Sequence, residues 1–273
     1  VTKLFSAVAT LRLVDRGLLE LTDEVIQLLE HRSGLPAWVP LFEQADVLTA
    51  ALAIQREHAP GERHTYSDIG FLHLLERLQK STGKGIAEII EEEVLSPLGL
   101  VNTSYRPAGF GPAPIDGRIA ATENCPRRGL LVGEVSDGNT YAMGGASTHA
   151  GLFGPASDLA LFAQAVWDAR DDGYLSSDLW ARIWADPAEP GTHIMGWDSV
   201  AEAPGKSSAG SKLSRRSRGH LGFTGTSLWI DPERAIAVVL LTNRVHPSRD
   251  DNRIRDLRPR LHDAVADMVD KLR

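Results

Sequence analysis

The chain has 273 residues, of which 42% are hydrophobic and 24% are charged, a balance typical of a globular protein. Its formal net charge of −7 argues against a nucleic-acid partner, because phosphate contacts need a clustered basic surface. The single cysteine, Cys125, excludes an internal disulfide. No run of apolar residues is long enough to cross a bilayer, so no membrane span is expected in this chain.

The apolar pattern predicts that residues 1–190 form a mainly helical subdomain. Apolar residues recur with helical spacing from Leu4 to Val14, and further apolar segments or helical patterns follow at 18–29, 43–58, 71–78, 86–94, 159–167 and 179–184. Ser157 or its neighbour and Ser176 or Ser177 are placed to cap the last two helices. Residues 101–155 show little periodicity, and an irregular stretch of that length indicates a functional region in a compact domain.

The residue pattern changes from helical to strand-like in residues 191–273, which we expect to form the sheet and the last helix of an α/β subdomain. Residues 193–201, 219–230 and 234–243 carry β-branched and aromatic residues separated by turn signals, so they are predicted as strands. An amphipathic helix closes the chain from Leu261 to Leu272. Three strands leave an exposed sheet edge, so we expect additional N-terminal strands, missing from this chain, to precede Val1.

Three separate clusters carry residues suited to chemistry. The chain opens Val1-Thr2-Lys3 at the start of a helical pattern, and a serine before Val1 would lie one helical turn from Lys3. Tyr66-Ser67-Asp68 lies in a polar turn before a helix. His220-Leu221-Gly222-Phe223 lies at a predicted strand, where glycine marks a bulge or a close backbone approach.

In order and spacing, these clusters resemble the penicillin-recognising serine hydrolases: class C β-lactamases, D-alanyl-D-alanine carboxypeptidases and related esterases. That family carries Ser-x-x-Lys, then Tyr-x-Asn, then Lys-Thr-Gly or His-x-Gly. The segment 28–35, which reads Leu-Leu-Glu-His-Arg-Ser-Gly-Leu, and the glycine loop 144–153 also match family patterns. The resemblance runs from Val1 through the final helix. It implies an α+β, β-lactamase-like fold, with a helical subdomain packed on a mainly antiparallel sheet flanked by helices.

The resemblance also implies a mechanism through an acyl-enzyme. A serine immediately before Val1 would attack a carbonyl carbon, and Tyr66 and Lys3 would share the proton as a coupled pair. We expect the Lys3 ammonium to lower the pKa of the Tyr66 phenol. The backbone N–H groups of the serine and of Phe223 would form the oxyanion hole, and Gly222 would let the substrate lie close to the strand.

Two positions depart from the pattern of β-lactamases. Asp68 stands where they have asparagine, and an ionised carboxylate can only accept hydrogen bonds, so either Asp68 pairs with a cation such as Lys3 or the substrate lacks the carbonyl that asparagine would bind. His220 stands where many relatives have lysine, and a neutral imidazole grips a carboxylate less reliably. Both departures favour an ester or a D-amino-acid peptide or amide over a β-lactam as the substrate.

Other expectations are simpler. No cofactor motif and no metal-ligand spacing are visible, so neither a cofactor nor a catalytic metal is expected, and His149 is expected to be a structural histidine bonded to backbone carbonyls. The resemblance implies a small-molecule ester, peptide or lactam substrate. The location is left open by the sequence, although relatives often work outside the cytoplasm. The alternative is a penicillin-binding-like protein without catalysis, acting in binding or regulation. Whether the serine before Val1 is removed, modified or truly absent stays open, as does the oligomeric state.

Overall fold

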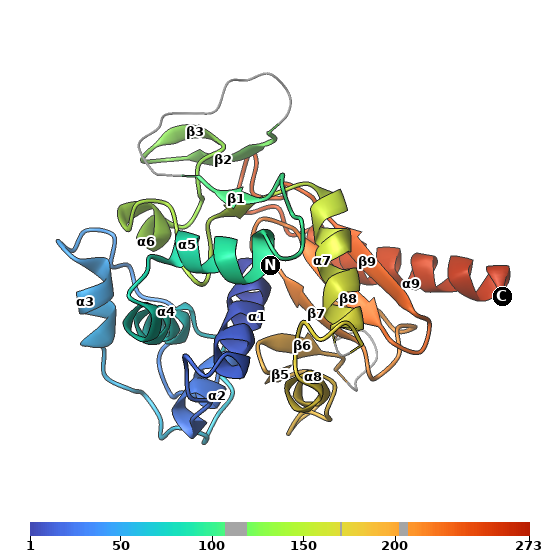
Figure 1. Cartoon of the computed structure of the whole chain (residues 1–273). Coiled ribbons are helices and arrows are strands. Elements are labelled where there is room, and N and C mark those ends of the chain that lie inside the picture. The colour runs from blue at the N-terminus through green and yellow to red at the C-terminus, as the bar shows by residue number, and fades with distance from the viewer. Residues whose placement is uncertain (107–118, 170, 202–206) are drawn as a thin grey trace.

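The computed structural model describes residues 1–106, 119–169, 171–201 and 207–273. These residues form helices and antiparallel sheets, as expected for an α+β protein (Figure 1). The helices are α1 (Thr2–Asp15), α2 (Asp23–Leu29), α3 (Val47–Leu52), α4 (Asp68–Thr82), α5 (Ile86–Ile90) with its π-helical continuation η1 (Glu91–Leu95), α6 (Gly138–Ala142), α7 (Ala156–Asp168), α8 (Ser177–Ile183) and α9 (Ile254–Leu272). The strands are β1 (Ser104–Tyr105), β2 (Ala121–Cys125), β3 (Gly129–Val132), β4 (Leu152–Phe153), β5 (His193–Ile194), β6 (Trp197–Ser199), β7 (Arg218–Leu221), β8 (Ser227–Asp231) and β9 (Ile236–Leu240).

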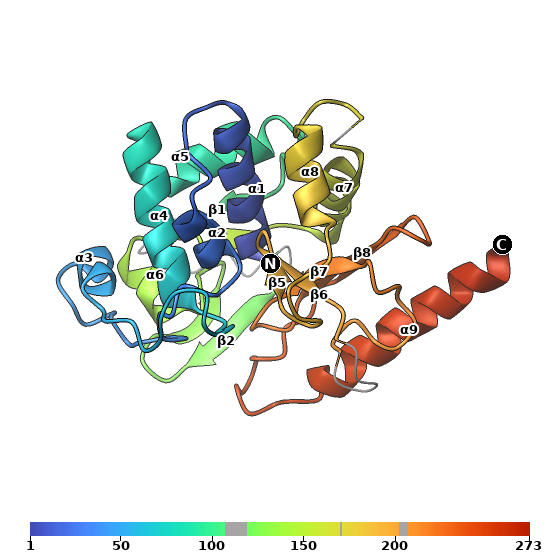
Figure 2. The same ribbon diagram turned by 90° about the horizontal axis from the view of Figure 1, so that it is seen from below.

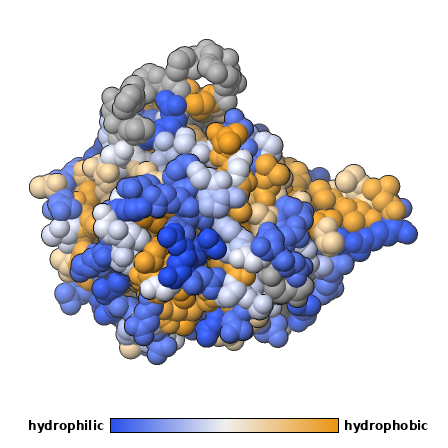
Figure 3. Space-filling model, viewed as in Figure 1, coloured by the Kyte–Doolittle hydropathy of each residue, from blue (hydrophilic) through white to orange (hydrophobic). Residues whose placement is uncertain are grey.

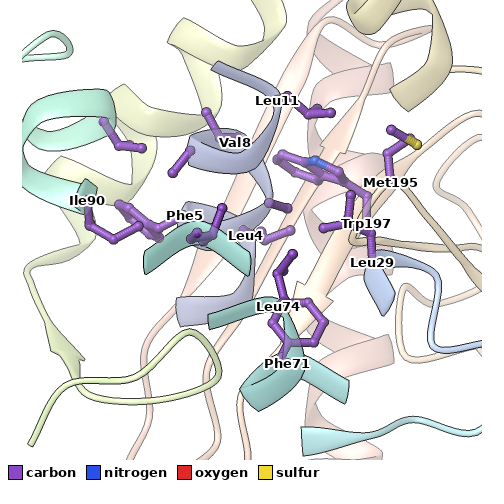
Figure 4. Packing of buried hydrophobic residues seen from close by; sticks show 14 of the residues in the cluster. Leu4, Phe5, Val8, Leu11, Leu29, Phe71, Leu74, Ile90, Met195 and Trp197 are labelled. Atoms are coloured by element: carbon purple, nitrogen blue, oxygen red, sulfur yellow. The ribbon is translucent and has the colours of Figure 1, made fainter. Parts of the chain in front are cut away.

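Helix α1 is the centre of the hydrophobic core. Almost its whole surface is buried, so its apolar residues contact neighbours on several sides instead of along one stripe. Figure 4 shows Phe5 and Val8 directed toward the helix that bears Ile90, while Leu4 and Leu11 lie on the side of Trp197. The Phe5 ring stacks on Phe162 of α7 with ring centroids 4.2 Å apart. This packing fixes the position of the first turn of α1, which carries Lys3.

The main sheet has five strands in the order β5-β6-β7-β8-β9, and each neighbouring pair is antiparallel. Helices lie on both of its faces, with α7 and α8 on one side and α9 on the other (Figure 2). Strand β7 lies in the middle of the sheet and carries the His220-Leu221 segment. Gly219 on β7 packs against the ring of Trp229, where an added Cβ would lie 2.4 Å from a ring atom. Close packing therefore fixes β7 against β8.

Most of the predicted elements are confirmed, and the differences have physical causes. The three predicted strand segments correspond to β5 to β9, but the predicted number of three strands is wrong, because each of the first two segments holds a pair of strands. The closing helix is present as α9. The helix predicted over 43–58 is wrong in length, because α3 spans only Val47–Leu52. Beyond it, the backbone N–H of Glu57 donates to the carbonyl of Gly34, and this tertiary bond replaces helical bonding. Ser157 does not cap α7, whose N-cap residue is Pro155.

The two predicted subdomains share one core. The largest cluster of buried apolar residues joins Leu4 of α1 and Leu74 of α4 to Trp197 and Leu228 of the sheet. The division at residues 190/191 stays a prediction about chain organisation. A smaller cluster, formed by Ala209, Leu213, Trp229 and Ala266, lies under α9.

The surface seen in Figure 3 is mostly polar, with apolar residues along one side of the protruding end of α9. Met268 and Leu272 on this end are 56% and 80% exposed. None of the helices in the described ranges combines the length and the apolar character needed to cross a bilayer.

Candidate active site

Lys3 lies at the start of α1 with its side chain almost completely buried. Its Nζ atom is 2.5 Å from Oδ1 of Asp68, and it lies 4.5 Å from the centre of the Tyr66 ring. Burial alone would lower the pKa of Lys3, but the negative charge of Asp68 and the Tyr66 hydroxyl outweigh burial and raise it. Lys3 is therefore held as an ammonium ion, and the expectation that Asp68 pairs with a cation is confirmed.

The turn that carries Tyr66 and Asp68 is fixed from both sides. The Oγ atom of Ser67 accepts the N–H of Gly70 at 2.8 Å and caps α4, so Asp68 occupies the first helical residue. The backbone N–H of Ser67 donates to Nδ1 of His31 at 3.0 Å. The His31 ring also packs on Tyr66, with ring centroids 4.5 Å apart. His31, which precedes the Ser33-Gly34 turn, therefore helps to hold Tyr66 and Ser67 in place.

The pKa of Tyr66 differs from the expected direction. Burial of the phenolate among neighbouring groups is the largest influence and raises the pKa, and the negative charge of Asp68 adds to this. The Lys3 ammonium opposes both effects without overcoming them. The side chain as a whole is 42% exposed, so the ring borders solvent while the charged form stays disfavoured. The expected lowering is wrong because burial of the phenol outweighs the charge of Lys3, and the carboxylate of Asp68 adds to the effect of burial.

The end of β7 lies against the start of α1. The backbone nitrogen of Val1 is 3.4 Å from the carbonyl oxygen of Leu221. A Cβ added to Gly222 would lie 2.0 Å from Oγ1 of Thr226 and 3.6 Å from the Val1 nitrogen. A side chain at position 222 would therefore clash with Thr226 in the turn that follows β7, so this turn requires glycine there. Phe223 comes next, is 59% exposed, and no acceptor in the described part of the chain takes its N–H.

His220 does not line an open surface. It is 1% exposed, and its Nδ1 atom lies 2.6 Å from the carbonyl oxygen of Leu221. Its ring centroid is 5.9 Å from that of Tyr66 and 5.5 Å from that of His193. Burial, followed by nearby positive charges, holds the pKa of His220 well below its usual value. The residue is therefore a neutral buried ring next to Tyr66.

A histidine cluster beneath Tyr66 could not be recognised from sequence spacing. His31, His193 and His220 place one ring nitrogen each within 4.8 Å of one another. His64 adds a contact of 3.0 Å between its Nε2 atom and Nδ1 of His193. These residues come from the segment after α2, the loop before α4, and strands β5 and β7. Because their separations along the chain are large, only the fold reveals the cluster.

A second group lies on the other side of Asp68. His149 contacts Oδ1 of Asp137 at 3.0 Å, the Thr140 hydroxyl at 3.1 Å and the Ser147 hydroxyl at 2.9 Å. The expectation that His149 bonds to backbone carbonyls is therefore wrong, because its partners are side chains. Although burial favours protonation, His149 and the N–H of Thr140 lower the pKa of Asp137. Ligand atoms of Asp68, Asp137 and His149 also lie within 4.8 Å of one another, a grouping that sequence spacing did not indicate.

The buried histidines predict a loss of stability in acid. Burial and the nearby His64 and Lys3 lower the pKa of His193 from 6.5 to about 3. Below pH 6.5 the unfolded chain binds more protons than the folded one, so stability falls as pH falls from about 6.5 toward 3, by about 2 kcal/mol at pH 5 for one such group. Urea unfolding at pH 7 and pH 5 measures this difference. It should shrink in His193→Gln and persist in the control His58→Gln; an equal difference in both variants would contradict the assignment.

Comparisons with known proteins identify the family and the fold. The family model described as Beta-lactamase matches residues 1–261. N-acetylmuramyl-L-alanine amidase of Bacillus subtilis is 32% identical over 253 residues, which are 81% of this chain and 56% of the relative. A candidate D-alanyl-D-alanine carboxypeptidase of Escherichia coli is 31% identical over 255 residues, which are 82% of this chain and 58% of the relative. This chain thus spans little more than half the length of these relatives.

A solved structure of a β-lactamase from Mycobacterium bovis shares the fold. Its TM-score is 0.68 at 22% identity, and the match covers 98% of this chain and 85% of that one. The β-lactamase-like α+β fold expected from the sequence motifs is therefore confirmed. From the family match and the identity to its relatives, the chain belongs to the β-lactamase family.

Proposed function

We propose that this protein is a serine hydrolase that acts through an acyl-enzyme on an ester or on a D-amino-acid peptide or amide. The nucleophile would be a serine joined to the nitrogen of Val1 in the full protein. One observation carries the proposal: the Val1 nitrogen lies 3.4 Å from the Leu221 carbonyl of β7, while Lys3 lies beside both Asp68 and Tyr66. A residue joined to Val1 is thereby positioned close to the end of β7 and one helical turn from Lys3.

The path of the serine proton depends on the protonation states of Tyr66 and Lys3. At neutral pH Tyr66 is a phenol and Lys3 is an ammonium ion, so acylation would draw on the minor form in which Tyr66 is ionised. That phenolate would take the serine proton as Oγ bonds to the carbonyl carbon. Tyr66 would then return the proton to the leaving group, and water would release the acyl group by the reverse path. The ammonium of Lys3 would stabilise the phenolate throughout.

The oxyanion would be held by two backbone N–H groups. The exposed turn after β7 offers the N–H of Phe223, and the serine would offer its own. The carbonyl of Phe223 accepts Nε of Arg244 at 2.8 Å, which helps to fix the orientation of this turn. His220 would support the turn from below instead of gripping a substrate carboxylate, because its ring is buried.

Asp68 supports the preference against β-lactams. Its carboxylate is held as an acceptor by Lys3 and its side chain is 22% exposed, so it would repel the carbonyl that an asparagine would bind. Penicillins and cephalosporins present such a carbonyl on their acylamino side chain. The relatives' names, an amidase and a candidate D-alanyl-D-alanine carboxypeptidase, fit amide substrates of bacterial cell-wall chemistry.

The test compares two chromogenic substrates with the full protein. We expect kcat/KM for a short-chain p-nitrophenyl ester to exceed kcat/KM for a chromogenic cephalosporin. A fluorophosphonate should label the serine before Val1, as located by peptide mass spectrometry. Faster cephalosporin turnover would overturn the substrate assignment alone. Absence of both labelling and turnover would favour the non-catalytic binding protein.

A further inference from the structure

The histidine cluster beneath Tyr66 contains two buried nitrogens that no group in the described residues satisfies. Nε2 of His31 and Nε2 of His220 have no hydrogen-bond partner, although both side chains are about 1% exposed. The His193 ring contacts both, with its centroid 4.6 Å from that of His31 and 5.5 Å from that of His220. A buried polar group without a partner is costly, so this place calls for a bound ligand.

The hydrogen bonds of the rings show which nitrogens carry protons. A carbonyl oxygen can only accept, so the contact with Leu221 places the proton of His220 on Nδ1 and leaves a lone pair on Nε2. The backbone N–H of Ser67 can only donate, so Nδ1 of His31 is an acceptor and the proton of the neutral ring is on Nε2. The cluster therefore contains one buried lone pair, on His220, and one buried N–H group, on His31, that lack partners among the described residues.

This pattern argues against a metal ion. A metal needs a lone pair from every ligand, and His31 can supply one only by losing its bond with Ser67. Lys3 adds repulsion, since its positive charge already disfavours a proton on His193 and His220.

We propose that His31, His193 and His220 together bind one buried water molecule. One ring nitrogen of each histidine lies within 4.8 Å of the others, so a single oxygen about 2.8 Å from all three, a normal hydrogen-bond length, is within their reach. The water accepts from His31 and donates to His220. The water keeps a second hydrogen and a second lone pair for His193. It can therefore donate to His193 or accept from it, whichever of His64 and His193 donates in the bond between them. Three hydrogen bonds are typical of a buried water.

The water links three parts of the site. It joins the turn after α2, strand β5 and strand β7, and so it connects the support of Tyr66 to the support of the Gly222-Phe223 turn. Its binding does not depend on the proposed hydrolase activity. It requires neutral rings, which is the state that burial favours at each of the three positions.

A crystal structure at high resolution tests the proposal directly. We expect a single peak about 2.7–3.1 Å from the three nitrogens, without anomalous signal at the zinc edge after a zinc soak. A peak about 2.0–2.2 Å from them with anomalous signal, or the absence of any peak, would overturn the proposal.

Zinc titration of the purified full protein provides the solution test. His193→Phe keeps a planar ring and removes both nitrogens, and His58→Phe is the matched control outside the cluster. We expect the same zinc stoichiometry in wild type and in both variants. We also expect a lower unfolding midpoint for His193→Phe than for His58→Phe, because the water loses a partner. One equivalent of zinc bound by wild type and lost only in His193→Phe, or equal midpoints, would contradict the water site.

Discussion

Replacing Lys3 with alanine in the full protein should lower the rate of acylation by about 10²–10⁴-fold. The change removes the cation that stabilises the Tyr66 phenolate, and it leaves Asp68 without its partner 2.5 Å away. The uncompensated carboxylate would then raise the pKa of Tyr66 further. The rate of fluorophosphonate labelling, measured in gel by fluorescence, gives the effect.

Lys80→Ala is the matched control, because Lys80 lies on α4 with its side chain 71% exposed. It should label at the wild-type rate. Circular dichroism and the unfolding midpoint must show that Lys3→Ala is folded. A folded Lys3→Ala protein that labels as fast as wild type would remove Lys3 from the mechanism.

Replacing Tyr66 with phenylalanine should cause a loss of similar size, again about 10²–10⁴-fold in kcat/KM for an ester. The ring remains to pack on His31, so the change isolates the hydroxyl. The pH profile makes the assignment specific. Since the pKa of Tyr66 is raised, the wild-type rate should increase steadily with pH through the alkaline range, and the residual rate of the variant should lack this increase.

Tyr174→Phe is the control for loss of a phenol elsewhere. The Tyr174 hydroxyl donates to the carbonyl of Glu93, and neither residue forms a hydrogen bond with Lys3, Tyr66 or Asp68 within the described part of the chain. Its pH profile should match wild type. An unchanged slope in Tyr66→Phe would assign the titrating base to another group.

The sequence predicted well those parts of the fold that depend on local pattern. The helical spacing from Leu4 to Val14 and the hairpin turn at Asp231-Pro232-Glu233 correspond to α1 and to the β8–β9 pair. The length of α3 was not predictable, because the bond from Glu57 to Gly34 that replaces the helix joins two distant segments. The helix propensity of a segment contains no information about a hydrogen bond to a residue outside that segment.

The site was predicted in part for the same reason. Lys3, Tyr66 and Asp68 belong to motifs whose spacing is informative, and the structure brings them together. His193 belongs to no motif, and it becomes visible only when β5 places it beside His31 and His220. The raised pKa of Tyr66 required knowledge of burial and of the Lys3–Asp68 distance, neither of which a sequence contains.

The burial of α1 has a consequence for how this protein can change. The helix that holds the core together also carries Lys3 on its first turn, so a substitution that loosens its packing would displace a residue of the proposed mechanism as well. Stability and activity are therefore tied together along α1. Exposed residues near the site, such as Phe223 in the turn after β7, carry less of this constraint. New substrate preferences should accordingly arise at such exposed residues, while α1 tolerates few replacements in evolution or in directed selection.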